Sequence, residues 1–216
     1  MRIGVLGTGM VGQAIATKLA EKNDVMVGSR DRNNLKAKAW IEKVSKMSLG
    51  TFEEAAQFGE VIFNCTKGSA TLAAFSLAGE KALGNKVVID TANPLEFSPT
   101  HEVSLFVSNT DSLAEQLQRT YPQIKVVKTL NTMTASLMVN PSLLPGKHSL
   151  FLAGNHDDAK KKVMTVLESN FGWKPESFID LGDITGARSL EMLVTVWVRL
   201  WNHYQNPLFN FSIITP

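Results

Sequence analysis

Three glycines near the amino terminus have the spacing of a phosphate-binding turn. They follow a short apolar stretch, Ile3–Leu6, and lead into an apolar-periodic stretch, Met10–Lys22; in full the segment is Gly7-Thr8-Gly9-Met10-Val11-Gly12. The first glycine of such a segment permits a tight turn, the second lets the backbone approach a pyrophosphate, and the third lets helix and strand pack closely. The following helix directs unpaired N–H groups at the anion. We therefore expect these six residues to bind a dinucleotide.

The end of the second predicted strand, Asp24–Ser29, indicates which dinucleotide is bound. A site for NAD places an acidic residue there to hold the ribose 2′-hydroxyl. This chain has Ser29 and Arg30, a hydroxyl and a guanidinium that suit a 2′-phosphate. Asp31 is one residue further on, and we assign it to the N-cap of the next helix. The sequence thus predicts NADP, and an ordinary polar turn is the alternative.

Small and amide-bearing residues follow three more predicted strands. They lie in the segments Cys65–Gly68, Thr91–Pro94 and Thr129–Thr132. Because ligands of open α/β sheets bind beyond the carboxyl ends of the strands, we expect these segments to form a second half-site for the nicotinamide ribose and ring. The residues that we assign to it are Cys65, Thr66, Lys67, Ala92, Asn93 and Asn131.

No residue pattern predicts a dedicated acid or base. Tyr121 and Lys125 are four residues apart, as in a short-chain dehydrogenase, but Pro122 and a predicted strand prevent them from sharing a helical face. The segment 184–191 offers Arg188 and Glu191 in place of the lysine of a β-hydroxyacid dehydrogenase. The four histidines have no metal-like spacing, and nothing near Cys65 marks an activated thiol. We therefore predict no catalytic side chain and no metal site. Hydride exchange between two redox cofactors does not require such a group.

Strands and helices that alternate must position these residues. This alternation predicts an α/β chain, a Rossmann-type doubly wound and mostly parallel sheet with a small C-terminal helical extension. We divide it into an NADP-binding domain over 1–165 and a C-terminal region over 166–216. The predicted strands are Ile3–Leu6, Asp24–Ser29, Val61–Cys65, Lys86–Asp90, Ile124–Lys128, Ser149–Ala153 and Ser177–Leu181. The predicted helices are Met10–Lys22, Asn33–Ser45, Phe52–Phe58, Ser112–Tyr121 (capped by Asp111 or Ser112), Asp157–Phe171 (ended by Gly172) and Gly186–Tyr204.

The last helix and the tail are unusually apolar. The helix has a stripe made of Leu190, Leu193, Val194, Trp197, Trp201 and Tyr204, and the tail adds Leu208, Phe209, Phe211, Ile213 and Ile214. Large apolar patches on folded proteins usually mark contacts, so we expect a homodimer formed through this region. The alternatives are a helix that faces only its own core, a tail that folds back on its own sheet, and a tail that walls the acceptor pocket.

Composition excludes several classes of protein. The 216 residues are 44% hydrophobic and 19% charged, which rules out a disordered chain. The 22 basic and 20 acidic residues form no block of like charge, so we expect no nucleic-acid partner. A single cysteine excludes an internal disulfide framework. Without a signal peptide or a sufficiently long apolar segment, we expect no membrane association and a cytoplasmic location.

Five segments together resemble a known family, the NADPH-dependent coenzyme F-420 (5-deazaflavin, also written F420) oxidoreductases and their bacterial relatives of unassigned substrate. They are MRIGVLGTGMVG, VGSR, VVKTLNTM, LAGNHDDAKKKVM and LEMLVTVWVRLW. The resemblance implies hydride transfer between NADPH and a deazaflavin in a homodimer, with Thr8, Ser29 and Arg30 at the 2′-phosphate. It also implies that the C-terminal region completes the acceptor pocket. The residues that it places at the acceptor are Thr132, Met133, Thr134, Ala135 and Phe209.

The chain departs from the archaeal members of that family at one point. They have His-Thr-Ile-Pro where this chain has Asn131-Thr132-Met133-Thr134. A flavin or another small redox acceptor therefore stays open beside the deazaflavin. The other functions that we weigh are an imine or carbonyl reductase of the pyrroline-carboxylate reductase kind and a non-catalytic NADP sensor.

Overall fold

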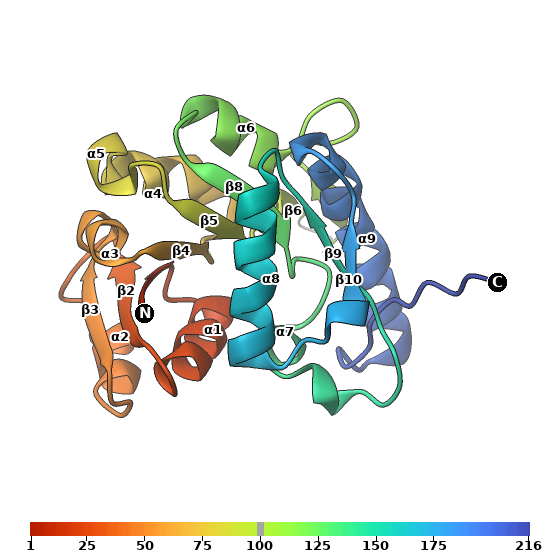
Figure 1. Cartoon of the computed structure of the whole chain (residues 1–216), viewed down its shortest axis with the longest axis horizontal. Coiled ribbons are helices and arrows are strands. Elements are labelled where there is room, and N and C mark those ends of the chain that lie inside the picture. The colour runs from red at the N-terminus through yellow and green to blue at the C-terminus, as the bar shows by residue number, and fades with distance from the viewer. Residues whose placement is uncertain (99–101) are drawn as a thin grey trace.

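A single large sheet forms the centre of the computed structural model, which describes residues 1–98 and 102–216 (Figure 1). Its strand order is β10-β9-β8-β5-β4-β1-β2-β3. The strands are β1 (Arg2–Leu6), β2 (Asp24–Ser29), β3 (Met47–Thr51), β4 (Val61–Asn64), β5 (Val87–Asp90), β8 (Lys125–Thr129), β9 (Leu150–Ala153) and β10 (Phe178–Asp180). From β3 to β8 all neighbours are parallel, whereas β9 pairs antiparallel with β8 and parallel with β10. The predicted mostly parallel sheet is confirmed.

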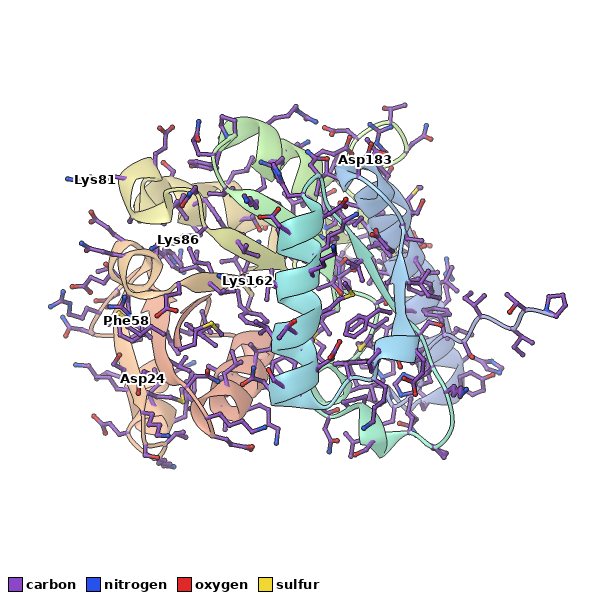
Figure 2. All side chains as sticks on the ribbon, in the orientation of Figure 1. Asp24, Phe58, Lys81, Lys86, Lys162 and Asp183 are labelled. Carbon is purple, nitrogen blue, oxygen red and sulfur yellow. The ribbon has the colours of Figure 1, made fainter. Side chains whose placement is uncertain are left out.

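Helices cover both faces of the sheet. On one face lie α1 (Met10–Ala20), α2 (Leu35–Ile41), α7 (Ala135–Val139) and α8 (Asp157–Phe171), which bury apolar side chains against the strands. On the other face lie α3 (Phe52–Phe58), α4 (Thr71–Ala78), α5 (Glu80–Leu83) and α6 (Leu113–Thr120). Apolar burial on both faces explains why the central strands are continuous apolar runs. Charged side chains such as those of Lys81, Lys162 and Asp183 are exposed and project outward (Figure 2).

Short helices and strands are difficult to predict from the sequence, because they contain too few residues to show a hydrophobic period. The strand β3, the helices α4, α5 and α7, and the antiparallel pair β6 (Leu95–Phe97) and β7 (Val103–Leu105) were not expected. Short 3₁₀ turns link other elements: η1 (Gly68–Ala70), η2 (Pro141–Leu143), η3 (Pro175–Ser177) and η4 (Ile184–Gly186). Among the elements that were not expected, α4 is the one that lines the cavity described below.

Capping residues set where several helices begin and end. Ser112 caps α6, one of the two residues predicted for that role, and Gly172 ends α8 in the left-handed conformation (φ 84°), as predicted. The predicted N-cap of α2, Asp31, is wrong. Asn34 caps that helix by accepting from the Ala37 N–H at 3.1 Å, whereas Asp31 accepts from the Asn33 N–H in the preceding turn.

The last helix, α9 (Ala187–Tyr204), packs its first half against the sheet, and the tail folds back on the same region. Phe209 stacks on Trp197 with ring centroids 5.5 Å apart, and the Ser149 N–H donates to the Phe211 carbonyl at 2.8 Å. The tail thus contacts the start of β9 and α9 in its own chain. Residue 165, our proposed boundary between two regions, lies inside α8. In the part of the chain that the structure describes, no helix is long and apolar enough to cross a membrane.

Candidate cofactor site

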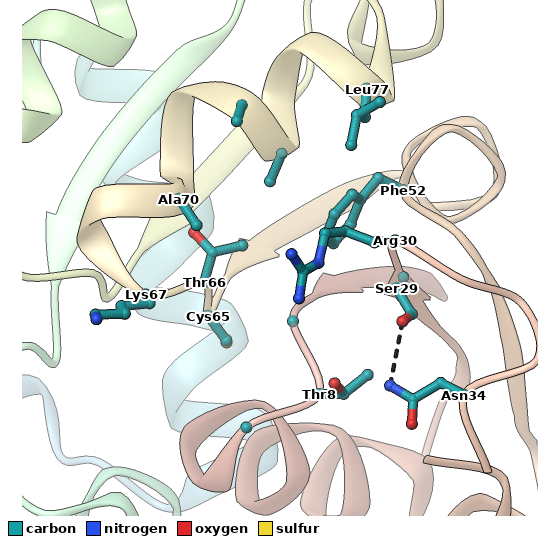
Figure 3. A pocket seen from close by; sticks show the side chains of 15 residues that line it. Thr8, Ser29, Arg30, Asn34, Phe52, Cys65, Thr66, Lys67, Ala70 and Leu77 are labelled. Atoms are coloured by element: carbon teal, nitrogen blue, oxygen red, sulfur yellow. Dashed lines mark hydrogen bonds between the residues drawn. The ribbon is translucent and has the colours of Figure 1, made fainter. Parts of the chain in front are cut away.

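A cavity of about 470 Å³ opens at the carboxyl ends of β1, β2 and β4 (Figure 3). It brings together eight of the residues assigned from the sequence to the glycine turn, the 2′-phosphate and the second half-site. These are Gly7, Thr8, Gly9, Ser29, Arg30, Cys65, Thr66 and Lys67. The cavity is lined in addition by Gly28, Asn34, Phe52, Ala70, Ala73, Ala74 and Leu77. Its place at the strand ends is typical of nucleotide sites in open α/β sheets.

The glycine turn has the geometry that a phosphate requires. Gly7 has φ +117°, and a Cβ there would lie 2.5 Å from the carbonyl oxygen of Cys65. A Cβ on Gly12 would lie 2.1 Å from the Gly7 oxygen, so helix and turn meet without room for a side chain. At Gly9 a Cβ meets nothing within 4 Å, because that position faces the open cavity. The N-cap of α1 is Gly9, which has no side chain to cap the helix and which lines the cavity, so the helix begins at the cavity. Met10 and Val11, the other members of the predicted segment, form its first turn.

Ser29 and Arg30 lie side by side at the cavity, and a third residue joins them. Arg30 points its guanidinium into the space, while the neighbouring Arg32 is paired with Glu54. The Ser29 hydroxyl oxygen accepts from the Asn34 amide at 3.3 Å and from the Asp31 N–H at 3.4 Å. Asn34 is not predicted from the sequence, where Asp31 is the expected cap.

The charge of the cavity favours anions. Arg30 and Lys67 line it, and no carboxylate is among the described residues that do so. Phe52 from α3 and Leu77 from α4 add an apolar wall opposite the glycine turn (Figure 3). Neither residue is assigned to a site from the sequence, and the short α4 carries no clear apolar stripe that would predict the place of Leu77. A cationic cavity with one flat apolar wall matches a phosphorylated nucleotide.

Cys65 packs as an apolar residue at the cavity floor. It is 8% exposed, and burial raises the pKa of its thiol to about 12. The thiol is therefore protonated at neutral pH, which does not suit a nucleophile. Beside it, the Thr66 hydroxyl donates to the side-chain oxygen of Asn64 at 2.7 Å.

Asn93 and Asn131 bind each other across the sheet edge. The amide of Asn93 donates to the Asn131 carbonyl, and the amide of Asn131 donates to the Asn93 side-chain oxygen, both at 2.8 Å. Asn131 also donates to the Leu190 carbonyl at 2.9 Å. The residue before it, Leu130, is held at φ 64°, a conformation that costs energy for a side chain of this size. Two of the three predicted segments of the second half-site are thus locked to one another and to α9.

The residues predicted at the acceptor do not all reach the surface. Thr132, Met133 and Ala135 are buried, and Thr134, at the start of α7, is half-buried. Phe209 lines a separate hollow beside α9, with Leu200 and Tyr204 among its neighbours. Its ring stacks on Trp197 rather than standing free.

Three charged residues near this edge were not assigned to a site from the sequence. Lys128, Asp90 and Glu191 form a buried cluster behind Ala92. The feature of the sequence that could have indicated this cluster is Lys128, a charged residue that follows two valines in the strand β8. Across the described ranges, no group of histidine, cysteine and acidic side chains is arranged to hold a metal ion. His101 lies outside those ranges.

Comparison with known proteins identifies relatives that span the whole chain. Residues 2–94 match the family described as NADP oxidoreductase, coenzyme F420-dependent. A crystal structure from Arthrobacter sp. FB24, of a protein assigned to the F420-dependent NADP-reductases, is 43% identical and superposes over 100% of both chains with a TM-score of 0.93. The F420-dependent NADP reductase of Methanocaldococcus jannaschii is 24% identical across 95% of each chain.

A more distant likeness concerns the fold alone. An imine reductase from Streptomyces aurantiacus is 16% identical with a TM-score of 0.65, covering 95% of this chain and 63% of its own. It therefore lends no support to the imine-reductase alternative. Its fold agrees with the doubly wound architecture, whereas the Arthrobacter protein matches this chain from end to end. The chain belongs to the family of coenzyme F420-dependent NADP oxidoreductases.

Proposed function

We propose that the cavity holds NADPH with its pyrophosphate at the Gly7–Gly12 turn and its 2′-phosphate at Ser29 and Arg30. The observation that carries this proposal is the end of β2, where a hydroxyl and a guanidinium face the cavity and no described lining residue is acidic. A carboxylate is the feature that an NAD site uses to hold the ribose 2′-hydroxyl. A planar guanidinium binds a phosphate through paired, charge-assisted hydrogen bonds.

The remaining lining residues divide between the two ends of the nucleotide. Thr8 lies close to the 2′-phosphate side in this proposal, and Phe52 and Leu77 cover the adenine. The nicotinamide half extends past Cys65 toward the edge of the sheet. Its proposed residues are Thr66, Lys67, Ala92, Asn93 and Asn131.

NADPH supplies the hydride when it is bound, and the chain orients it. The α1 N-terminus offsets the charge of the pyrophosphate, and the Asn93–Asn131 pair fixes the edge against which the nicotinamide lies. On the acceptor side we propose the segment Thr132–Ala135, of which Thr134 is the partly accessible side chain. Backbone groups and Thr134 then provide the contacts, because the other side chains are buried.

Coenzyme F420 is our first candidate for the acceptor. The relatives from Arthrobacter and Methanocaldococcus carry F420-dependent NADP reductase in their names, and the family description does so too. A flavin is the second candidate, since Asn131 and Thr134 stand where the archaeal pattern has histidine and proline.

We also propose a homodimer formed through α9 and the tail. Several large apolar side chains stay exposed there although the tail folds back on its own chain. They are Met192, Val196, Trp201, Tyr204, Ile213 and Ile214. Phe209 lines the hollow beside α9. We propose that it contacts the acceptor if the acceptor enters from that side.

Calorimetric titration tests the nucleotide assignment. Loss of a charge-assisted hydrogen bond costs about 1.5–3 kcal/mol, so NADPH is expected to bind about tenfold to a hundredfold more tightly than NADH. Arg30→Ala should shrink this preference and leave NADH binding nearly unchanged. Arg32→Ala is the matched control, because Arg32 is two residues away in the sequence and already paired with Glu54. Equal affinities for the two nucleotides in the wild type contradict the proposal.

A spectrophotometric screen then identifies the acceptor. NADPH oxidation is followed with coenzyme F420, flavin mononucleotide, riboflavin and ferric chelates. Fast turnover with F420 alone is the expected outcome. Turnover with flavins alone would mean that the acceptor is a flavin and not the deazaflavin. Absence of turnover with every acceptor would favour a non-catalytic NADP sensor.

A further inference from the structure

Three ionisable side chains lie buried behind the carboxyl edge of the sheet. The Lys128 Nζ is 2.9 Å from Asp90 Oδ2 and 2.8 Å from Glu191 Oε1, and none of the three side chains is more than 1% exposed. They come from β8, β5 and α9, which are far apart in the sequence. We call Asp90, Lys128 and Glu191 the buried triad.

The triad holds the backbone of one residue from both sides. Lys128 donates to the Ala92 carbonyl, and the Ala92 N–H donates to Asp90 Oδ1 at 3.2 Å. Ala92 is followed by Asn93, which binds Asn131. The position of this turn is therefore set by Lys128 and Asp90.

A second arm of the network leads to the cofactor cavity. Asp90 Oδ1 accepts from the Asn64 amide at 2.7 Å, and the Asn64 oxygen accepts from the Thr66 hydroxyl at 2.7 Å. Thr66 lines the cavity. A continuous path of hydrogen bonds thus joins Lys128 to a residue of the proposed nicotinamide half-site.

The third arm leads to the last helix. Glu191 of α9 accepts from the Leu113 N–H at 2.8 Å and from the Ala114 N–H at 3.1 Å, at the positive end of α6. Burial alone would lower the pKa of Lys128, but Asp90 and Glu191 outweigh it and raise that pKa above its ordinary value. The lysine is therefore charged at neutral pH, and all three of its N–H groups have partners.

Stability by itself is a weak reason for such a cluster. Buried ion pairs can often be replaced by apolar side chains of similar volume with little loss of stability. Apolar side chains could not hold the N–H and C=O groups of Ala92, nor connect them to Asn64. What the triad adds is a fixed place for the turn at the sheet edge.

From this geometry we infer that the buried triad is a positioning group for the nicotinamide half-site. Lys128 and Asp90 fix the Ala92–Asn93 turn and the Asn64–Thr66 pair, and Glu191 makes their position depend on the placement of α9. The inference rests on the proposed function, in which the nicotinamide of NADP lies against these residues. It assigns a role in orientation and no direct contact with the cofactor.

The test compares two ligands that share the adenosine half of the proposed site. NADPH would occupy both halves of that site, whereas adenosine 2′,5′-bisphosphate lacks the nicotinamide and would occupy only the adenosine half. The double variant Lys128→Met, Glu191→Gln removes the amino group and one of the two carboxyl groups, while Asp90 keeps its two other donors. We expect its affinity for NADPH to fall about tenfold and its affinity for the bisphosphate to change less than about twofold.

Lys160→Met provides a matched control. Lys160 is also nearly buried, lies 2.7 Å from Asp180 and 3.1 Å from Asp157, and donates to the Gly182 carbonyl, but it lies between α8 and β10. This variant should bind both ligands as the wild type does. A shift in NADPH affinity equal to that of the double variant would overturn the inference.

The remaining outcomes separate the inference from the proposed function. Equal weakening of both ligands by the double variant, or no change in either, overturns the inference alone. Wild-type protein that binds neither ligand overturns the proposed function, and the inference with it. If circular dichroism shows the double variant unfolded, Glu191→Gln alone is titrated with both ligands, and about a threefold loss for NADPH only is expected. Unfolding of both variants would assign the triad to stability and overturn the inference.

Discussion

The Asn34 side chain links the start of α2 to the hydroxyl of Ser29. Its amide donates to the Ser29 oxygen at 3.3 Å, while its own oxygen accepts from the Ala37 N–H at 3.1 Å (Figure 3). With the Asp31 N–H as a second donor, both lone pairs of the Ser29 hydroxyl are occupied. The hydroxyl hydrogen is therefore left to donate into the cavity, which suits a phosphate oxygen.

Replacing Asn34 tests this arrangement. Asn34→Ser keeps a residue that caps helices well but removes the amide donor. Because an ordinary hydrogen bond contributes about 0.5–1.5 kcal/mol, NADPH affinity should fall about twofold to tenfold while NADH affinity is unchanged. Calorimetric titration of both nucleotides measures the two effects.

A double-mutant cycle with Ser29→Ala shows whether Asn34 acts through the hydroxyl. In the Ser29→Ala background, Asn34→Ser should have no further effect on NADPH. A full additional loss would show instead that the Asn34 amide contacts the nucleotide directly.

Enlarging Gly9 should abolish nucleotide binding and leave the fold intact. The Cβ of Gly9→Val meets nothing within 4 Å, so the side chain occupies cavity space that the pyrophosphate needs. Circular dichroism should match the wild type while NADPH binding is lost. Gly12→Ala is the contrasting variant, since its Cβ would lie 2.1 Å from the Gly7 oxygen and the turn itself must move. Normal NADPH binding by folded Gly9→Val would show that the pyrophosphate lies elsewhere.

Truncation after Asn206 tests the proposed dimer. It removes Phe209 from its stack on Trp197 and exposes the start of β9, where Phe211 is now bonded to Ser149. If the tail makes the interface, light scattering should show a monomer. Unchanged dimeric mass, with acceptor reduction lost and NADPH binding retained, would place the tail at the acceptor and contradict the dimer contact.

The ion pair of Asp111 and Arg119 predicts a specific pH dependence. Side-chain hydrogen bonds from Arg119 at 2.9 Å lower the pKa of Asp111 to about 2. A folded pKa below the unfolded value of about 3.9 means that the pair stabilises the fold above pH 4. That contribution is lost as the pH falls from about 4 to about 2. Since Arg119 is largely exposed, we expect Asp111→Asn to lower the free energy of unfolding by at most about 1 kcal/mol at pH 7.

Urea denaturation at several pH values measures this difference. The gap between wild type and Asp111→Asn should close near pH 2. A gap that stays constant down to pH 2 would mean that the carboxylate of Asp111 is not the stabilising group.

Features that depend on neighbours along the chain can be predicted from the sequence alone. The glycine turn and the Ser29–Arg30 pair each lie within a few residues, so spacing is enough to define them. The strand–helix alternation is a series of such local patterns along the chain. Long helices such as α8 and α9 follow from a sustained apolar period, and their ends were predicted to within a residue. The parallel sheet follows from the alternation, because parallel strands need crossover helices.

Features built from segments that are distant in the sequence become visible only in the folded chain. The apolar wall at Leu77 depends on a short helix that has no apolar stripe of its own. The reversed direction of β9 and the docking of the tail depend on pairings between segments that spacing does not define. Asp90, Lys128 and Glu191 are ordinary charged residues in the sequence. They become one buried cluster because the fold removes all three from water at the same place, where each charge must find a partner.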